Sequence, residues 1–205
     1  MTNPAEHWDA VYAAKATNEV SWFEIEPITS LRLLKQWASS SDSVVDVGAG
    51  VSTLVDSLVD AGWADVTVLD LSQEALNKVR DRLGERAEPI SFIGTDVCCW
   101  QPQRRFGAWH DRAVFHFLVQ PEDRDRYVAL TTEYVTPSGV VVLGAFASDG
   151  PTHCSGLPTA RYDAKGLADT FGSGFVLEHT EREEHTTPTG MLQPFTWVVL
   201  RRRQQ

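Results

Sequence analysis

The sequence predicts a three-layer α/β sandwich in which helices cover a mostly parallel sheet. From residue 43 onward, short β-branched apolar segments alternate with amphipathic helical segments, which is the pattern of parallel βαβ units. The last two predicted strands, residues 174–183 and 192–203, have no helical pattern between them. They can therefore pair as an antiparallel hairpin at one edge of the sheet.

Two helices are predicted ahead of the sheet. Residues 4–16 form a short amphipathic helix with Trp8 and Tyr12 on one face, because residues four apart lie on the same side of a helix. A loop follows over residues 18–27, and a second helix covers residues 28–38.

The sheet region begins with the buried strand 43–48. Predicted helices are recognised by their ends: Gly62 and Gly84 stop two of them, and Asp163 caps the start of another. In chain order, the elements that follow are a helix 51–62, a strand 64–72, a helix 73–84, strands 89–97 and 106–115, a helix 120–135, a strand 137–147 and a helix 163–172.

Composition excludes several classes of function. The chain has 205 residues and a net charge of −10, which argues against a nucleic-acid partner because such partners select basic surfaces. No apolar run approaches the roughly 18 residues of a membrane span, so no membrane partner is expected. The three cysteines have neither disulfide nor zinc spacing, and a cytoplasmic protein without a metal is expected. Monomer and homodimer both stay open.

A glycine turn follows the first strand of the sheet. In "VVDVGAGVSTL", Gly48 and Gly50 allow a tight turn and a close backbone approach to a ligand, while Ser52 stands where a third glycine is common. Ligands of doubly wound sheets bind outside the carboxyl ends of the strands, where this turn lies. A plain βα turn would show the same glycines.

Acidic residues at successive strand ends strengthen the ligand hypothesis. Asp70 follows the glycine turn by the roughly 20 residues expected of a ribose-binding acid, and Asp96 ends the third strand. Both are also explained as helix caps. Asp46, just before the turn, would repel a pyrophosphate but suits a ligand that carries an ammonium or a sulfonium. This points to S-adenosylmethionine as the cofactor.

Together, the stretches "VVDVGAG", "VTVLDLS" and "GTDV" resemble the three cofactor motifs of class I S-adenosylmethionine-dependent methyltransferases. The resemblance implies a Rossmann-like α/β/α sandwich of seven strands in the order 3-2-1-4-5-7-6, with one antiparallel strand. It implies a single domain, in which residues 1–42 cover the cofactor and acceptor cleft of a core formed by residues 43–205. It also implies a cofactor held by Asp46, Gly48, Gly50, Asp70, Leu71, Asp96 and Val97.

The N-terminal residues 7–27 look like the leading segment of small methyltransferases, which folds over the cofactor. This resemblance implies that Trp22 contacts the cofactor and that Trp8 helps to bind the methyl acceptor. The alternative is that both tryptophans only fill the core.

At the end of the fourth strand stands "HDRAVFHFL", within a stretch similar to thiopurine methyltransferases, which show Trp-Asp-Arg, an apolar turn, Pro, Asp-Arg and Tyr. His110 and Asp111 are expected to border the cofactor, and Asp111 and His116 are the catalytic candidates. His116 is either a core histidine or the group that handles a proton during transfer. The stretch also resembles an Asp-Lys-Gly signature of protein-lysine methyltransferases, which have an acid at the position of His116.

Loops at the same edge are expected to supply the rest of the acceptor pocket. The Gly/Pro-rich segment 144–163 is a candidate lid that offers His153, Cys154, Arg161 and Tyr162, and the last hairpin turn offers His185. Arg161 suits an anionic acceptor or a surface ion pair. The predicted function is methyl transfer to a small-molecule nucleophile, such as a thiol or a related soft heteroatom. The alternatives are a protein-lysine methyltransferase and a module that binds the cofactor without transfer.

Overall fold

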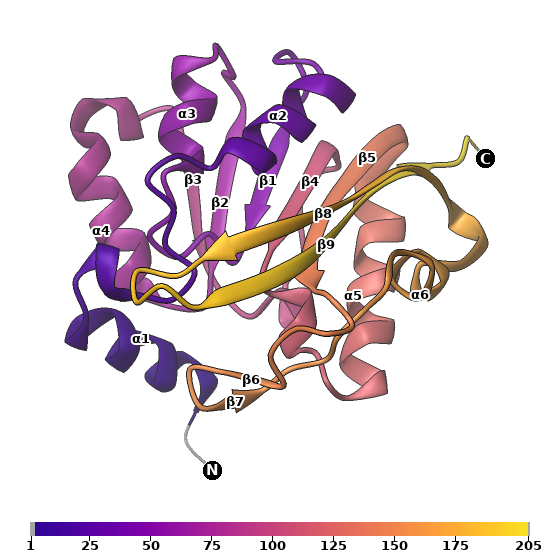
Figure 1. Cartoon of the computed structure of the whole chain (residues 1–205). Coiled ribbons are helices and arrows are strands. Elements are labelled where there is room, and N and C mark those ends of the chain that lie inside the picture. The colour runs from indigo at the N-terminus through magenta and orange to yellow at the C-terminus, as the bar shows by residue number, and fades with distance from the viewer. Residues whose placement is uncertain (1–2, 205) are drawn as a thin grey trace.

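The computed structural model describes residues 3–204 and contains one seven-stranded sheet in the order β3-β2-β1-β4-β5-β9-β8 (Figure 1). All neighbours pair in parallel except β9, which is antiparallel to both β5 and β8. Counted within the sheet, this is the predicted order 3-2-1-4-5-7-6. The strands are β1 Val44–Val47, β2 Val66–Asp70, β3 Ser91–Gly94, β4 Phe106–Arg112, β5 Val135–Phe146, β8 Phe175–Thr186 and β9 Leu192–Arg202.

Helices cover both faces of the sheet, as predicted. The helices α2 Ile28–Trp37, α3 Leu54–Asp60 and α4 Gln73–Leu83 share one apolar cluster with Val44, Val68 and Val142 of the sheet. On the other face, α5 Pro121–Tyr134 and α6 Ala164–Thr170 pack against Val45 and Val141. Because β1 and β2 are buried along their whole length, their sequences are mostly apolar on both faces, with Asp46, Thr67 and Asp70 as buried polar exceptions.

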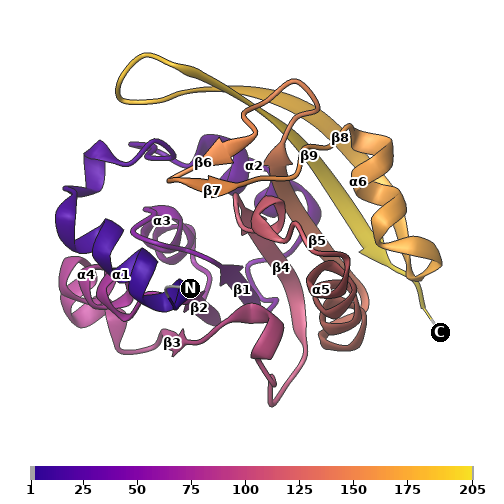
Figure 2. The ribbon, with the colours of Figure 1, turned by 90° about the horizontal axis from the view of Figure 1, so that it is seen from below.

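The parallel register brings the functional strand ends together. Val47, the last residue of β1, lies opposite Leu69 of β2 and Asp111 of β4. The glycine turn, the end of β2 and the end of β4 therefore meet at one edge of the sheet, which is the lower edge in Figure 1. Figure 2 looks onto this edge, where α1 and the small hairpin β6–β7 lie.

The helix α1 (Pro4–Ala14) is fastened across this edge. Its Asp9 accepts hydrogen bonds from Ser72 Oγ at 2.5 Å and from the backbone N–H of Glu74 at 3.1 Å, at the start of α4. Lys78 donates to the carbonyl oxygen of Tyr12 at the other end. By contrast, α2 packs against one face of the sheet through fully buried leucines. Within residues 3–42, the covering part is therefore α1 and the following loop.

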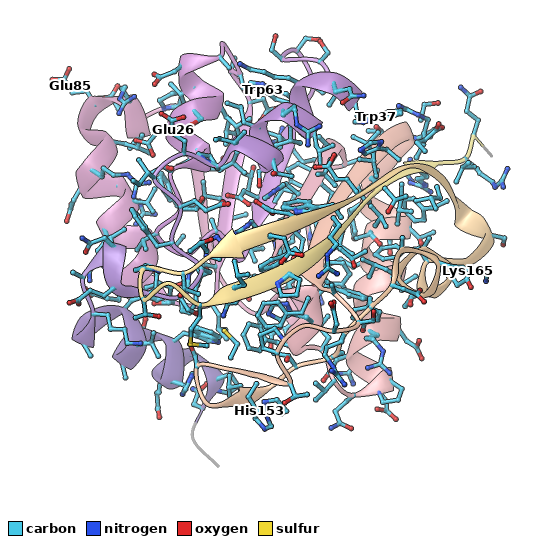
Figure 3. All side chains as sticks on the ribbon, viewed as in Figure 1. Glu26, Trp37, Trp63, Glu85, His153 and Lys165 are labelled. Carbon is cyan, nitrogen blue, oxygen red and sulfur yellow. The ribbon has the colours of Figure 1, made fainter. Side chains whose placement is uncertain are left out.

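The predicted lid segment contains a hairpin that the sequence did not reveal. Strands β6 His153–Cys154 and β7 Leu157–Pro158 have two residues each, which is too short for an alternating pattern. His153 points outward at the lower edge in Figure 3. Asp163 caps α6 as predicted, accepting a hydrogen bond from the backbone N–H of Gly166 at 2.6 Å.

The described part of the chain, residues 3–204, also contains five short 3-10 helices: η1 Thr17–Glu19, η2 Gly84–Ala87, η3 Val97–Cys99, η4 Phe115–Phe117 and η5 Gly172–Gly174. Within residues 3–204, no helix has the length and apolar character needed to cross a bilayer. In the same range, no three histidine, cysteine or acidic side chains gather in a way that could hold a metal ion. Trp37 and Trp63 lie at the end of the molecule opposite His153 (Figure 3).

Candidate functional site

A cavity of about 290 Å³ lies at the carboxyl edge of the sheet, beneath α1. One half of its wall comes from the ends of β1, β2 and β3, and the other half comes from η4, β5, the β6–β7 hairpin and β9. The predicted site residues on its wall are Trp8, Trp22, Gly48, Asp70, Leu71, Asp96, Val97 and His116. They come from six separate segments of the chain, so the fold assembles them.

The glycine turn requires glycine for two reasons. Gly48 has φ +63°, and a Cβ atom there would stand 1.9 Å from Cγ2 of Val114. Gly50 has φ +54°, and a Cβ atom there would stand 2.3 Å from the Tyr12 hydroxyl. Both conformations disfavour any side chain, and both positions lack room for one. Gly48 lines the cavity, whereas Gly50 lies under Tyr12 just behind its wall.

Asp70 is held rigidly at the cavity wall. Its Oδ2 accepts the backbone N–H of Gly50 and its Oδ1 that of Ser72, both at 2.7 Å. Burial raises the pKa of this carboxyl to about 6, against the opposing effect of the two amides. Each oxygen keeps a lone pair for a further donor, so Asp70 can accept hydrogen bonds from a ligand.

Asp96 lies just past the end of β3 at Gly94, not within the strand as predicted, and caps η3, where its Oδ1 accepts the backbone N–H of Cys98 at 2.8 Å. Leu71 and Val97 add apolar surface beside the two carboxylates. This half of the cavity therefore combines a close-approach glycine, two oriented acceptors and an apolar slot. A nucleoside presents the matching groups, namely hydroxyls, an exocyclic amine and a flat ring.

Asp46 and His110 lie in a smaller adjoining chamber of about 40 Å³, behind the glycine turn. His110 Nδ1 donates to Asp46 Oδ1 at 2.7 Å, and both side chains are buried. Gly48, Trp22 and Arg112 line both chambers. Asp46 and His110 were predicted to bind the cofactor, but they lie behind the glycine turn and do not line the main cavity.

Arg112, at the end of β4, ties the N-terminal loop to the sheet. Its Nη1 donates to the Trp22 carbonyl oxygen at 2.9 Å, and its Nη2 lies 3.2 Å from Glu24 Oε1. Burial raises the pKa of Glu24 to about 7, while Arg112 opposes that shift. The guanidinium also lies over the Phe195 ring at 4.9 Å. This cation at the cavity wall was not among the predicted site residues.

Asp111, predicted to be catalytic and cofactor-binding, does not line either chamber and is fully buried. Its Oδ1 accepts the backbone N–H groups of Val114 and Phe115 at 3.0 and 3.3 Å. Its Oδ2 accepts the Tyr127 hydroxyl at 2.7 Å, and that hydroxyl accepts Trp109 Nε1 at 2.9 Å. The geometry suits a positioning residue that fixes the turn before His116.

His116 combines the two alternatives that the sequence leaves open, because it is fully buried and also lines the cavity. Its ring stacks on Phe146 with centroids 4.1 Å apart, and the backbone N–H of Phe146 donates to Nδ1 at 3.3 Å. Burial, aided by Arg112, lowers the pKa of His116 to about 3. Among the residues that the structure describes, Nε2 has no partner.

Aromatic rings roof the cavity. Trp8 contacts Trp22 and Phe117 edge to face, with centroids 5.6 and 5.3 Å apart, and Tyr12 packs against Trp22 at 6.1 Å. Both tryptophans are partly exposed and line the cavity, as expected of a lid rather than of core fillers alone.

The other predicted acceptor residues lie elsewhere. Tyr162 packs on Phe115 with centroids 5.6 Å apart, and Arg161 is exposed. His185 Nε2 donates to the carbonyl oxygen of Ser21 at 2.7 Å, which ties the β8–β9 hairpin to the N-terminal loop. None of the three lines the cavity.

Cys154, which the predicted lid segment offered, does line the cavity. The other wall residues of this part were not indicated by the sequence: Phe117, Phe146, Leu157, Gln193 and Phe195. Gln193 and Phe195 lie on β9, and only the pairing of β9 with β5 brings them to this edge. The implied strand order places β9 beside β5, but neither that order nor the periodicity of β9 says which of its side chains reach the cavity. Gln193 is buried and its Oε1 has no partner within residues 3–204, so it is a further ligand-binding candidate.

The fold and the cavity define an α/β domain with a pocket at the carboxyl ends of its parallel strands. Residues 44–139 match the family model described as a methyltransferase domain. Together with the strand order, this match to just under half of the chain supports the resemblance to class I S-adenosylmethionine-dependent methyltransferases.

Individual relatives are distant. The chain is 28% identical over 127 residues to thiocyanate methyltransferase 1 of Arabidopsis thaliana, covering 60% of this chain and 54% of that protein. It is 23% identical over 120 residues to the eEF1A lysine and N-terminal methyltransferase of Mus musculus, covering 58% of this chain and 17% of that protein. The chain thus spans about half, or less, of the length of these curated relatives.

Among solved structures, the chain resembles a 1,6-didemethyltoxoflavin-N1-methyltransferase of Burkholderia thailandensis, solved with 1,6-didemethyltoxoflavin and S-adenosylhomocysteine bound. The TM-score is 0.74 at 19% identity, and the match covers 100% of this chain and 92% of that one. This likeness supports the fold.

Proposed function

We propose that the protein transfers the methyl group of S-adenosylmethionine to a small-molecule nucleophile, namely a thiol or a related soft heteroatom. One observation carries the proposal: two carboxylates, Asp70 and Asp96, are fixed at strand ends beside Gly48 in one half of the cavity. This is the nucleoside half. In the other half, which we call the acceptor half and which is formed by the end of β4, η4, β5, the β6–β7 hairpin and β9, no described residue contributes a carboxylate to the wall.

The nucleoside half fits S-adenosylmethionine. Asp70 has lone pairs left for ribose hydroxyls, Asp96 has a second oxygen for the adenine amine, and Leu71 and Val97 offer apolar surface to the ring. When bound, S-adenosylmethionine supplies a sulfonium methyl whose carbon–sulfur bond breaks, leaving its electron pair on sulfur, as an acceptor lone pair forms the new bond to carbon. The chain positions the acceptor and excludes water under Trp8 and Trp22.

The acceptor half favours a small nucleophile over a lysine. An ammonium ion is stabilised by a nearby carboxylate, and the wall offers Arg112 and His116 instead. The thiocyanate methyltransferase of Arabidopsis thaliana, a relative named for a small sulfur-containing acceptor, supports this choice. Protein-lysine methylation is the second candidate, because the eEF1A lysine and N-terminal methyltransferase is also a relative.

Asp70→Asn is expected to weaken binding of S-adenosylhomocysteine about 10- to 100-fold, because one carboxylate oxygen that accepts ligand hydroxyls becomes an amide donor. Titration calorimetry measures this directly. Asp169→Asn is the matched control, since Asp169 is exposed on α6 and pairs only with Lys165. Equal affinity of wild type and Asp70→Asn would remove Asp70 from the cofactor site.

Incubation of the protein and labelled S-adenosylmethionine with a fractionated cell lysate distinguishes the acceptor classes. We expect label in the small-metabolite fraction and none above background in protein, because the acceptor half carries no carboxylate for a lysine ammonium. Label in lysine residues would favour the second candidate. Cofactor binding without label in any fraction would indicate a binding module.

A further inference from the structure

His116 has a fixed neutral form. The backbone N–H of Phe146 donates to its Nδ1, so Nδ1 is an acceptor and the ring proton resides on Nε2. Stacking on Phe146 and an edge-to-face contact with Phe117, whose ring centroid lies 4.6 Å from that of His116, hold the ring in this orientation. The side chain therefore presents an N–H donor rather than a lone pair.

That donor lacks a partner inside the protein. Nε2 is buried and has no hydrogen bond from or to any residue of the range 3–204, although an unpaired buried donor costs about 1–3 kcal/mol. The ring lines the acceptor half of the cavity. A ligand atom in the cavity is the partner that this geometry leaves room for.

The surroundings decide which ligand atom that is. Arg112 is the charged group acting on His116. Burial raises the pKa of the Cys154 thiol, so Cys154 stays a neutral thiol. Within the described part of the chain, Asp70 and Asp96 are the carboxylates on the wall, and both belong to the nucleoside half. Arg112 is paired with Glu24 of the adjoining chamber, so the acceptor half offers an ammonium no free carboxylate on its wall.

We propose that His116 donates its Nε2 proton in a hydrogen bond to the nucleophilic heteroatom of the methyl acceptor and thereby selects acceptors whose reactive atom arrives without its proton. The inference rests on the proposed function, whose acceptor it narrows. A thiolate takes the hydrogen bond on one lone pair and attacks with another, giving a neutral thioether. No proton moves within the site, because the thiol has already lost its proton to solvent.

A direct measurement needs no acceptor. Nitrogen-15 NMR of the labelled protein, free and saturated with S-adenosylhomocysteine, reports the tautomer of each histidine, and a His116→Gln spectrum assigns the His116 signals. We expect that Nδ1 of His116 is unprotonated, that Nε2 carries the proton, and that the ring does not titrate from about pH 5 to about pH 8. An ordinary histidine titrates near 6.5. Titration of His116 in this range, or a proton on Nδ1, would overturn the proposal.

Kinetics with two probes of one skeleton, benzyl mercaptan and benzylamine, test the selection. We expect kcat/KM for the thiol to rise about tenfold per pH unit as the thiolate fraction grows, without a further inflection from a histidine base. Benzylamine, which is an ammonium ion at neutral pH, is expected to be a poorer acceptor by at least about 100-fold. A preference for benzylamine, or a histidine inflection that His116→Gln removes, would contradict the proposal.

Variants separate a donor from a base. His116→Leu removes the donor and is expected to lower kcat/KM for the thiol about 10- to 100-fold with unchanged affinity for S-adenosylhomocysteine. His116→Gln keeps an N–H donor and is expected to retain most of the activity, whereas loss of a base would affect both variants equally. Thermal melting checks folding, and the wild-type NMR result stands if a variant does not fold. Failure of wild type to bind S-adenosylhomocysteine would contradict the proposed function itself, while binding with a titrating His116 would contradict only this inference.

Discussion

Replacing Asp111 by alanine is expected to lower the free energy of unfolding by roughly 3–5 kcal/mol. The carboxylate is fully buried, and its removal leaves the backbone N–H groups of Val114 and Phe115 and the Tyr127 hydroxyl without their acceptor. Each orphaned donor costs about 1–3 kcal/mol. Chemical denaturation with wild type as reference measures the loss, and a change below about 1 kcal/mol would show that these hydrogen bonds do not support the fold.

Two milder variants at the same network serve as controls. Asp111→Asn keeps one oxygen for the Val114 and Phe115 amides, and Tyr127→Phe removes a single donor. Both are expected to cost less than Asp111→Ala. Since the network fixes the turn that leads into η4, Asp111→Ala should also disturb His116, whose NMR signals report on the turn independently of stability.

Acid also has a defined effect at this position. Burial raises the pKa of Asp111 from 3.8 to about 6, so the folded state binds the proton more tightly than the unfolded chain does. The contribution of this titration to stability is fully present below pH 3.8 and is lost as the pH rises through about 6. The stability of wild type relative to Asp111→Asn should therefore fall between about pH 4 and about pH 7.

The nucleoside half of the site was within reach of the sequence because it depends on local signals, whereas the strand order was implied by the resemblance of the three motifs to a known family. Gly48, Asp70 and Asp96 each stand at a strand end, and strand ends in a parallel sheet converge on one edge. Hence the residues could be placed together before their contacts were known. The predicted hairpin at the sheet edge is likewise local, because nothing helical separates β8 from β9.

The acceptor half was much harder to predict because it depends on contacts between distant segments. Phe195 reaches the cavity opposite Phe146 of β5, and the implied strand order does not give the register of that pair. Cys154 reaches it through a hairpin of two-residue strands. Asp111 looked catalytic beside His116, yet a one-residue step along a strand turns a side chain to the opposite face. Asp111 therefore meets Tyr127 of α5, whereas Arg112 meets the N-terminal loop.

Gly48→Ala is expected to lower the free energy of unfolding by about 2–5 kcal/mol and to weaken S-adenosylhomocysteine binding at least about tenfold. The substitution meets two separate obstacles. A left-handed φ of +63° costs a non-glycine residue about 1–2 kcal/mol, and a Cβ atom 1.9 Å from Cγ2 of Val114 adds about 1–3 kcal/mol of overpacking. Displacement of Val114 also shifts the turn before η4, which shapes the acceptor half.

The chain contains a matched control for the first obstacle alone. Gly62 has φ +86°, and a Cβ atom there would meet nothing within 4 Å. Gly62→Ala should therefore show the backbone cost without the clash and leave cofactor affinity unchanged. Combining Gly48→Ala with Val114→Ala removes the clash but not the strain, so a double-mutant cycle should recover the packing part of the loss. If Gly48→Ala lowered the free energy of unfolding no more than Gly62→Ala did, and the cycle showed no coupling, the side chain of Val114 would not be what requires glycine at position 48.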